Sequence, residues 1–357
     1  MKKLKDFEKE INKCSKCGLC QNDCPIFQLT GNECAVSKGK FAMLYGVIKG
    51  DLKLSKKINS YLDLCTKCGK CSKQCPAGIN VCEIFTHAKY EFLQNKLSFK
   101  ILRWLQSEFF FDKIIETTNK ITTPIRRKNA IPNQEILYFK GCVNKIYPKT
   151  ENALKKIFNK ANITLTDGNF NCCGLPFFSS GNLERFENVV THNSDIINNS
   201  NAKIILTDCA SCQYIIKNYP NINKPVLNIE NLEALQQLHF SFNKEHLVAF
   251  HEPCHSETPY NITKILNNCA NINQTNIPKS CCGLAGEFTI KNPKLAYLLG
   301  KKRVQEILES KADTILTTCP ACIFGLKKAL WLKGKFNIKV KHLIEFLAEA
   351  DKVEQIN

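Results

Sequence analysis

The chain reads Ala202-Lys-Ile-Ile-Leu-Thr-Asp-Cys209-Ala-Ser-Cys212, and later it reads Ala312-Asp-Thr-Ile-Leu-Thr-Thr-Cys319-Pro-Ala-Cys322. Two further segments recur: Asn171-Cys-Cys-Gly174 returns as Ser280-Cys-Cys-Gly283, and Phe139-Lys-Gly-Cys142 returns loosely as Phe250-His-Glu-Pro-Cys254. The offsets between matching cysteines are 110, 109 and 112 residues (319 − 209, 281 − 172 and 254 − 142). Three separate segments at nearly one spacing indicate that a whole domain has been duplicated.

Each copy is predicted to be α/β, because short aliphatic runs alternate with helical patterns. The runs at 135–139 and 202–207 in the first copy, and at 246–250 and 314–317 in the second, all end close to a cysteine. Helical patterns cover 150–161 and 292–310. This alternation favours a parallel sheet, in which ligands bind at the carboxyl ends of strands. All four cysteine-bearing strand ends fit that rule.

Each copy therefore carries five cysteines on three loops. The first quintet is Cys142, Cys172, Cys173, Cys209 and Cys212, and the second is Cys254, Cys281, Cys282, Cys319 and Cys322. Five soft ligands exceed what tetrahedral zinc uses, so we expect an iron–sulfur cluster of unusual ligation, or four ligands and a spare thiol. Zinc in one copy and a redox dithiol stay open. Cys269, which has no counterpart in the first copy, is expected to be structural.

Two histidines flank Cys254 in the sequence His251-Glu-Pro-Cys254-His255. A histidine beside a cluster transfers protons or faces a substrate in some sites, and in others it is a hydrogen-bonded part of the scaffold. The sequence leaves both roles open for His251 and His255.

The N-terminal part carries the pattern C-x2-C-x2-C-x3-C-P twice, at Cys14 to Pro25 and at Cys65 to Pro76. This is the run of bacterial ferredoxins, in which three close cysteines bind one [4Fe-4S] cluster and the fourth binds the other. We therefore expect one cluster on Cys14, Cys17, Cys20 and Cys75, and a second on Cys24, Cys65, Cys68 and Cys71. Zinc sites usually use two separated pairs of ligands, which explains these runs poorly. Cys34 and Cys82 lie outside both runs and are expected to be buried small apolar residues.

The 357 residues include 21 cysteines and carry a formal charge of +18. That formal charge counts every cysteine as neutral. A cubane with four thiolates carries a charge of about −2, so all four expected clusters would lower the net charge by roughly 10. The lysines are scattered, so nucleic acid is not an expected partner; an acidic partner or an anionic membrane surface suits the remaining excess. The start has no signal-peptide pattern and no apolar run reaches about 18 residues, which favours a cytoplasmic location and metal-bound cysteines.

The expected organisation has four parts. They are a ferredoxin-type α-helical domain with two [4Fe-4S] clusters (1–90), a helical connector (91–130), and two duplicated α/β domains (131–237 and 238–357). The apolar and basic stretch Phe99 to Phe111 suits contact with a membrane, although such helical stripes more often face a core. Residues 37–40 are expected to begin a helix rather than to bind phosphate.

Two ferredoxin runs followed by two domains of the form C…CCG…CxxC resemble the CCG-domain (cysteine-rich) iron–sulfur oxidoreductases. That family includes the glycolate oxidase iron–sulfur subunit, the heterodisulfide reductase D subunit and related lactate-oxidation proteins. The segments 24–40, 250–255 and 281–286 look most like the glycolate oxidase subunit. The complete last pair, Cys319 and Cys322, is closer to heterodisulfide reductases, whose CCG domains hold non-cubane [4Fe-4S] clusters.

The resemblance implies an electron-transfer subunit of a membrane-associated 2-hydroxy-acid (glycolate or lactate) dehydrogenase. The chain has no flavin or nicotinamide fingerprint, so a FAD-containing partner is expected, with quinone or a membrane-associated acceptor. The implied cofactors are two [4Fe-4S] clusters and one or two further clusters, or zinc, in the repeats. The implied location is cytoplasmic, with peripheral contact at the inner face of the cell membrane left open. The alternatives are a heterodisulfide- or disulfide-reductase-type catalytic subunit and a zinc-stapled scaffold; the sequence identifies no catalytic residue.

Overall fold

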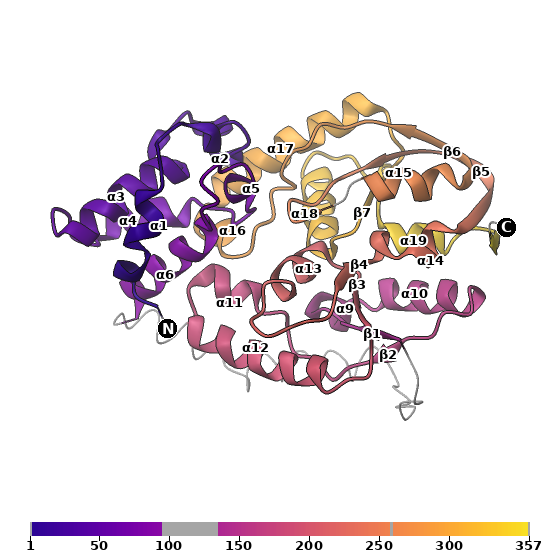
Figure 1. Cartoon of the computed structure of the whole chain (residues 1–357). Helices are drawn as coiled ribbons and strands as arrows, with labels where there is room; N and C mark the ends of the chain where they lie inside the picture. The colour runs from indigo at the N-terminus through magenta and orange to yellow at the C-terminus, as the bar shows by residue number, and fades with distance from the viewer. Residues whose placement is uncertain (1, 95–134, 258–259, 356–357) are drawn as a thin grey trace. The chain divides into compact units, whose positions relative to one another are not determined.

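The computed structural model describes residues 2–94, 135–257 and 260–355, which form two compact units (Figure 1). The N-terminal unit contains residues 2–94 together with 176–187 and 280–301. The sheet unit contains 135–175, 188–257, 260–279 and 302–355. Of the predicted connector, only 91–94 are described, and Phe99 to Phe111 lies outside the described residues. The predicted domain limits stay predictions.

The N-terminal unit is built from helices and short 3₁₀ turns. In chain order these are η1 (Leu4–Phe7), α1 (Glu8–Asn12), η2 (Leu19–Gln21), α2 (Pro25–Thr30), η3 (Glu33–Ala35), α3 (Ser37–Lys49), α4 (Lys56–Asp63), α5 (Lys70–Lys73) and α6 (Val81–Leu93). The unit also takes in most of α11 (Leu175–Ser180), α16 (Glu287–Lys291) and the first turns of α17 (Pro293–Ser310). The helix predicted to begin at residues 37–40 is α3.

One apolar core holds the N-terminal helices together. Phe7 and Ile11 from η1 and α1, Phe41 from α3, and Ile84 and Phe85 from α6 are buried there. Burial of such side chains contributes about 1.5–3 kcal/mol each, which compensates for the shortness of most of these helices. The core thereby fixes the loops that carry the cysteine runs.

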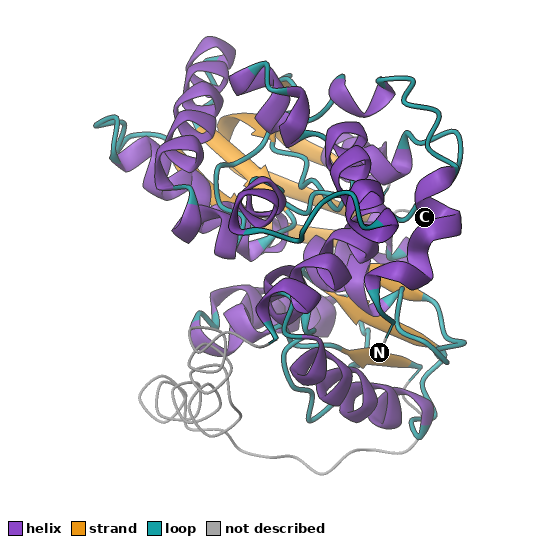
Figure 2. Ribbon diagram, turned by 90° about the vertical axis from the view of Figure 1, so that its left-hand side faces the viewer, coloured by secondary structure: helices purple, strands orange, loops and turns teal. Residues whose placement is uncertain are grey.

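The sheet unit contains two mainly parallel sheets covered by helices (Figure 2). The first has the order β2 (Thr166–Asp167), β1 (Ile136–Tyr138), β3 (Ile204–Thr207), β4 (Val226–Asn228). The second has the order β6 (Cys269–Thr275), β5 (Leu238–Phe250), β7 (Thr314–Thr317), β8 (Lys339–His342), and β9 (Lys352–Gln355) pairs with β5 in the antiparallel direction. The helices are α9 (Cys142–Ile146), α10 (Lys149–Lys160), most of α12 (Leu183–Asn198), α13 (Ala210–Ile216), η4 (Ile229–Asn231), α14 (Glu233–Gln236), α15 (Tyr260–Asn267), the end of α17, α18 (Pro320–Trp331) and α19 (Leu343–Leu347).

The two sheets confirm the predicted duplication. Their four parallel strands have the same order, and the register pairs Thr207 with Asn228 in one sheet and Thr317 with His342 in the other. Strands and helices lie where the sequence predicted them, with β1, β3, the end of β5 and β7 each preceding a cysteine. Side chains from both repeats, including Leu206 and Leu316, share one apolar core. None of the described helices is long and apolar enough to cross a bilayer.

Candidate metal centres

The two cysteine runs have closely similar backbones. Lys16 and Lys67 have left-handed φ angles of 58° and 56°, and Gly18 and Gly69 have φ of 86° and 72°. The glycines precede η2 and α5, where a left-handed residue lets the chain turn into a helix without steric cost. Pro25 opens α2 directly after Cys24. The equal spacing of the cysteines therefore produces equal local geometry.

The structure brings Cys24 close to the second run. The thiols of Cys24, Cys68 and Cys71 each interact electrostatically with Cys65. Cys14 and Cys75, 61 residues apart (75 − 14), both pack against the N-terminal core, while Cys17 is exposed and Cys20 is partly exposed. The crossed assignment of Cys24 to one cluster and Cys75 to the other stays a prediction.

Three buried lysines surround the second run. Burial raises the pKa of the Cys65 thiol, but the charges of Lys40, Lys67 and Lys89 outweigh that effect and hold it below its usual value. Buried ammonium groups are costly unless an opposite charge lies nearby. A cubane with four thiolates carries about −2, so this environment fits an anionic iron–sulfur centre.

The two cysteines outside the runs, Cys34 and Cys82, were both predicted to be buried, and they differ in the structure. Cys82 is buried, its carbonyl accepts a hydrogen bond from Lys67 Nζ at 3.1 Å, and burial raises the pKa of its thiol to about 12. Cys34 is partly exposed, so its predicted burial is wrong. It lies in the short turn η3, which leaves one side open to solvent. Cys269 is buried in β6, as a structural cysteine should be.

The first quintet comes together in the sheet unit. Its members are carried by α9, by the loop before α11 and by the start of α13. The Sγ atoms of Cys142 and Cys172 are 3.6 Å apart, and Cys173 is hydrogen-bonded to both Cys172 and Cys212. Cys212 is in turn hydrogen-bonded to Cys209. Five gathered thiols, four of them buried, form a donor set that suits a soft metal or an iron–sulfur cluster.

The second quintet is divided between the two units. Cys254, Cys319 and Cys322 belong to the sheet unit, and Cys281 and Cys282 belong to the N-terminal unit. Cys319 is hydrogen-bonded to Cys322 and also to Cys209 of the first quintet. The CxxC pairs of the two repeats therefore adjoin within the sheet unit, and the second quintet as a ligand set stays a prediction.

One thiol in each repeat, Cys173 in the first and Cys319 in the second, has a lowered pKa that favours the thiolate. Hydrogen bonds from Cys172 and Cys212 lower the pKa of Cys173 to about 5. Hydrogen bonds from Cys209 and Cys322 hold the pKa of Cys319 well below its usual value. The thiolate is the form that ligates metal, so these two residues are prepared for binding.

Polar contacts fix the residues that directly precede the two CxxC pairs, and sequence reasoning missed them. Asp208 accepts hydrogen bonds from Tyr138 Oη at 2.8 Å and from Asn144 Nδ2 at 2.5 Å, and its carbonyl oxygen lies 2.7 Å from Nε2 of His342. Thr318, the counterpart of Asp208, accepts at its carbonyl from the Ala210 N–H at 3.0 Å. The repeat itself pointed to these residues, because Asp208 and Thr318 stand at matching positions directly before Cys209 and Cys319.

The two histidines beside Cys254 are both buried. Nδ1 of His251 accepts from Nε of Arg303 at 3.0 Å. His255 stacks on Tyr214 with ring centroids 4.4 Å apart, and its Nδ1 lies 3.1 Å from Ser211 Oγ, which is itself 3.7 Å from Cys319 Sγ. These contacts suit a scaffold role, and the Ser211–His255 pair also lies next to the adjoining thiols.

The Cys281-Cys282 loop is fixed to the ferredoxin-run helices within the N-terminal unit. Cys281 and Cys24 pack against one small core that includes Ile26 and Phe288. Gly283 has a φ of +84°, and a Cβ there would meet the backbone carbonyl of Ala296 at 2.8 Å. Glycine is therefore required for this loop to lie against α17.

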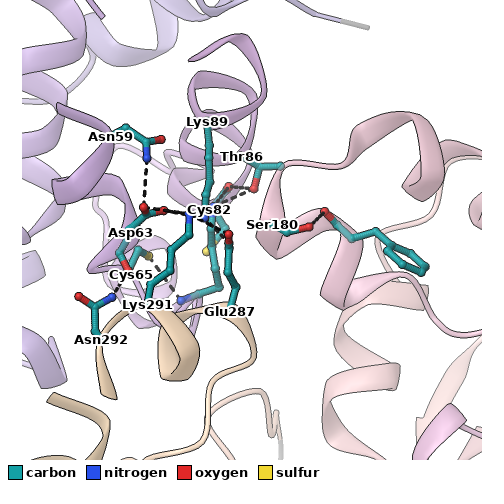
Figure 3. Close-up of polar contacts among 12 residues, drawn as sticks. Asn59, Asp63, Cys65, Cys82, Thr86, Lys89, Ser180, Glu287, Lys291 and Asn292 are labelled. Carbon is teal, nitrogen blue, oxygen red and sulfur yellow. Dashed lines mark hydrogen bonds and ion pairs between the residues drawn. The ribbon is translucent and has the colours of Figure 1, made fainter. Parts of the chain in front are cut away.

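Four charged side chains anchor the helix that follows this loop (Figure 3). Lys89 of α6 pairs with Asp63 at 2.8 Å and with Glu287 of α16. Lys291 pairs with the same two carboxylates, at 2.9 Å and 2.8 Å. Asn292 Nδ2 also donates to the Asp63 carbonyl at 2.9 Å. The network joins segments that are far apart in the sequence, so it holds the second CCG loop beside Cys24.

Two family models match this chain. A 4Fe-4S dicluster domain covers residues 10–79, and the cysteine-rich domain CCG covers 136–217 and 248–327. Relatives that align with nearly all of it include the following three. The B subunit of the fumarate reductase (CoM/CoB) of Methanothermobacter marburgensis is 25% identical, over 97% of this chain and 74% of the relative. The D subunit of the dihydromethanophenazine:CoB–CoM heterodisulfide reductase of Methanosarcina barkeri is 24% identical, over 96% and 94%. The glycolate oxidase iron–sulfur subunit of Escherichia coli K12 is 23% identical, over 95% and 94%.

Proposed function

We propose that this chain, which belongs to the CCG-domain iron–sulfur oxidoreductases, is the electron-transfer subunit of a glycolate- or lactate-type dehydrogenase. As a member of this family it is an iron–sulfur subunit of an oxidoreductase. Bound iron–sulfur clusters supply one-electron transfer. The sequence has no flavin or nicotinamide fingerprint, so in this proposal a FAD-containing partner oxidises the 2-hydroxy acid and a quinone is the final acceptor.

The observation that carries the proposal is the packing of Cys24 and Cys281 against one core. Cys24 is a predicted ligand of the second [4Fe-4S] cluster, and Cys281 belongs to the second CCG quintet. Electron transfer between two centres requires that their ligand sets be held close together. The ion pairs of the buried Lys89 and of the half-buried Lys291 provide that rigidity within the N-terminal unit.

Purification of the native complex tests the proposal. An anaerobic preparation from the source cells should contain a flavoprotein together with this chain, and should reduce a dye with glycolate or lactate. The chain purified without a flavoprotein, and without this activity, would contradict it.

Iron analysis tests the cofactor part separately. We propose two [4Fe-4S] clusters on the ferredoxin runs, which supply about eight iron atoms. The CCG quintets should add further iron, or zinc in one of them. Anaerobic protein with eight or fewer iron atoms and no zinc would mean that the quintets are not metal sites.

A second candidate function is a disulfide or heterodisulfide reductase. The contact between Cys209 and Cys319 favours it, because it brings thiols of both repeats together at one place in the sheet unit. The isolated, cluster-loaded chain should then reduce a disulfide with a strong one-electron donor. Absence of turnover with any such donor excludes this candidate and leaves the electron-transfer role intact.

A further inference from the structure

We propose that the end of α18 and the loop after it bind an anionic membrane surface peripherally. We define the basic–aromatic tip as the exposed apolar and basic residues of 324–339: Phe324, Lys327, Lys328, Trp331, Leu332, Lys333, Lys335, Phe336 and Lys339. The inference goes beyond the electron-transfer role and does not depend on the substrate or the partner flavoprotein.

Apolar exposure is concentrated at the tip. Among the described residues, nine large hydrophobic side chains are exposed, and four of them lie between residues 324 and 336. Trp331 is 64% exposed and Phe336 is 72% exposed. A lone exposed aromatic needs no explanation, but a group of them on one short segment marks an interaction site.

The same segment is strongly basic. Residues 324–339 contain five lysines and no acidic residue, and all five lysines are exposed. Partial burial lowers the pKa of Lys327; the charge of Glu345 opposes this effect, and the charges of Lys149 and Lys341 add to it. Such a cluster attracts anionic surfaces and works over roughly a Debye length.

A hollow of about 920 Å³ lies next to the tip in the sheet unit. Tyr147, Lys149, Lys327, Trp331 and Lys335 are among the residues that line it. The Nζ atoms of Lys149 and Lys327 lie 5.6 Å and 5.7 Å from the centroid of the Tyr147 ring. Ammonium groups held over an aromatic wall suit the phosphate of a lipid headgroup, with the acyl chains meeting Trp331 and Phe336.

The chemistry of the tip favours a membrane over an acidic protein. Its positive charge comes from lysine alone, and no arginine occurs in residues 324–339. The centres of protein interfaces are depleted in lysine and enriched in arginine. Interfacial membrane segments instead combine lysine, whose long stem reaches the headgroups, with tryptophan and phenylalanine at the hydrocarbon boundary.

Vesicle co-sedimentation of the full-length, cluster-loaded protein tests the proposal. We expect binding to vesicles of phosphatidylglycerol and phosphatidylcholine, little binding to pure phosphatidylcholine, and release at high salt. Lys333→Glu with Lys335→Glu should weaken the apparent affinity at least ~10-fold, and Trp331→Ala with Phe336→Ala should weaken it comparably.

Matched controls exclude a general charge effect. Lys53→Glu with Lys57→Glu changes two exposed lysines of the N-terminal unit, and Ile290→Ala with Tyr297→Ala removes two exposed apolar side chains there. Both should bind vesicles like the unmodified protein. The proposal would be overturned if the tip variants bound vesicles like the unmodified protein, or if the controls lost binding equally. It would also be overturned if the unmodified protein bound no vesicles, and that result would point to an acidic protein partner.

Discussion

Lys16 and Lys67 occupy the same place in the two cysteine runs, two residues after the first cysteine, with nearly the same left-handed backbone. Lys16 is exposed to solvent. Lys67 is buried, and its Nζ donates to the Cys82 carbonyl at 3.1 Å and to Thr86 Oγ1 at 2.8 Å. The same motif therefore carries a solvated charge in one run and a fixed, desolvated charge in the other.

Packing causes the difference. Helix α6 supplies Cys82, Thr86 and Lys89 around the second run, and α3 adds the buried Lys40. A charge in a low-dielectric environment acts far more strongly than one in water. Spacing thus determines which cysteines can ligate, and packing determines the electrostatic environment, which tunes the reduction potential of a bound cluster.

Loss of a ligand should have the largest effect and tests whether the runs are correctly paired. If the ligation is crossed, Cys24→Ser should alter the same electron paramagnetic resonance signal as Cys65→Ser, leaving a labile or three-iron centre. Cys75→Ser should alter the same signal as Cys14→Ser. A Cys24→Ser spectrum that matches that of Cys14→Ser would show that Cys24 binds the first cluster and that the ligation is not crossed.

Removal of Lys89 should cost the most stability among the three buried lysines. Lys89→Met leaves the half-buried Lys291 to neutralise both Asp63 and Glu287, and breaking a buried pair typically costs about 3–5 kcal/mol. Anaerobic urea unfolding should show this loss. The control is Lys49→Met, which breaks an exposed pair with Glu8 and should leave the unfolding curve unchanged. Equal unfolding curves for both variants would mean that the ion pairs of the buried Lys89 add no more stability than the exposed pair of Lys49.

A buried acid in the sheet unit extends the comparison to a site outside the runs. Burial raises the pKa of Glu230 to about 7, although it accepts hydrogen bonds from Asn228 at 3.1 Å and Thr318 at 3.3 Å. Since the folded pKa lies above the unfolded one, the stability it contributes is complete below pH 4.5 and is lost as the pH rises through 7.

Glu230→Gln removes this proton linkage. At ~1.36 kcal/mol per pKa unit, the free energy of unfolding of the unmodified protein should fall by up to about 3 kcal/mol relative to the variant between about pH 5 and pH 8. Exposed Glu233→Gln is the control and should follow the unmodified protein. Parallel pH profiles for Glu230→Gln and the unmodified protein would contradict the prediction.

The sequence predicted those parts of the structure that local pattern and repetition encode. The strand ends before Cys142, Cys209, Cys254 and Cys319 followed from aliphatic runs, and the equal order of the two sheets followed from the repeat. The pairing of Lys89 with Glu287 could not be predicted, because a contact between residues 198 positions apart leaves no periodic signal. The contrast between Lys16 and Lys67 was equally hidden, since identical motifs differ only in what packs on them.

The smallest expected effect is on reduction potential, and it tests the comparison most directly. Lys67→Met removes a buried positive charge beside the second run while keeping the length of the side chain. A lost interaction of ~1–2 kcal/mol corresponds to roughly 40–90 mV for a one-electron couple, so the midpoint potential of the second cluster should fall by that amount. The potential falls because the oxidised cluster carries one negative charge fewer and is therefore stabilised less by the lysine.

Lys16→Met, at the equivalent position of the first run, is the control. It should shift the midpoint potential of the first cluster by less than ~20 mV, since water screens an exposed charge. Redox titration followed by electron paramagnetic resonance measures both. Equal shifts in the two variants would show that solvent reaches both runs alike and that the buried lysines do not tune the second cluster.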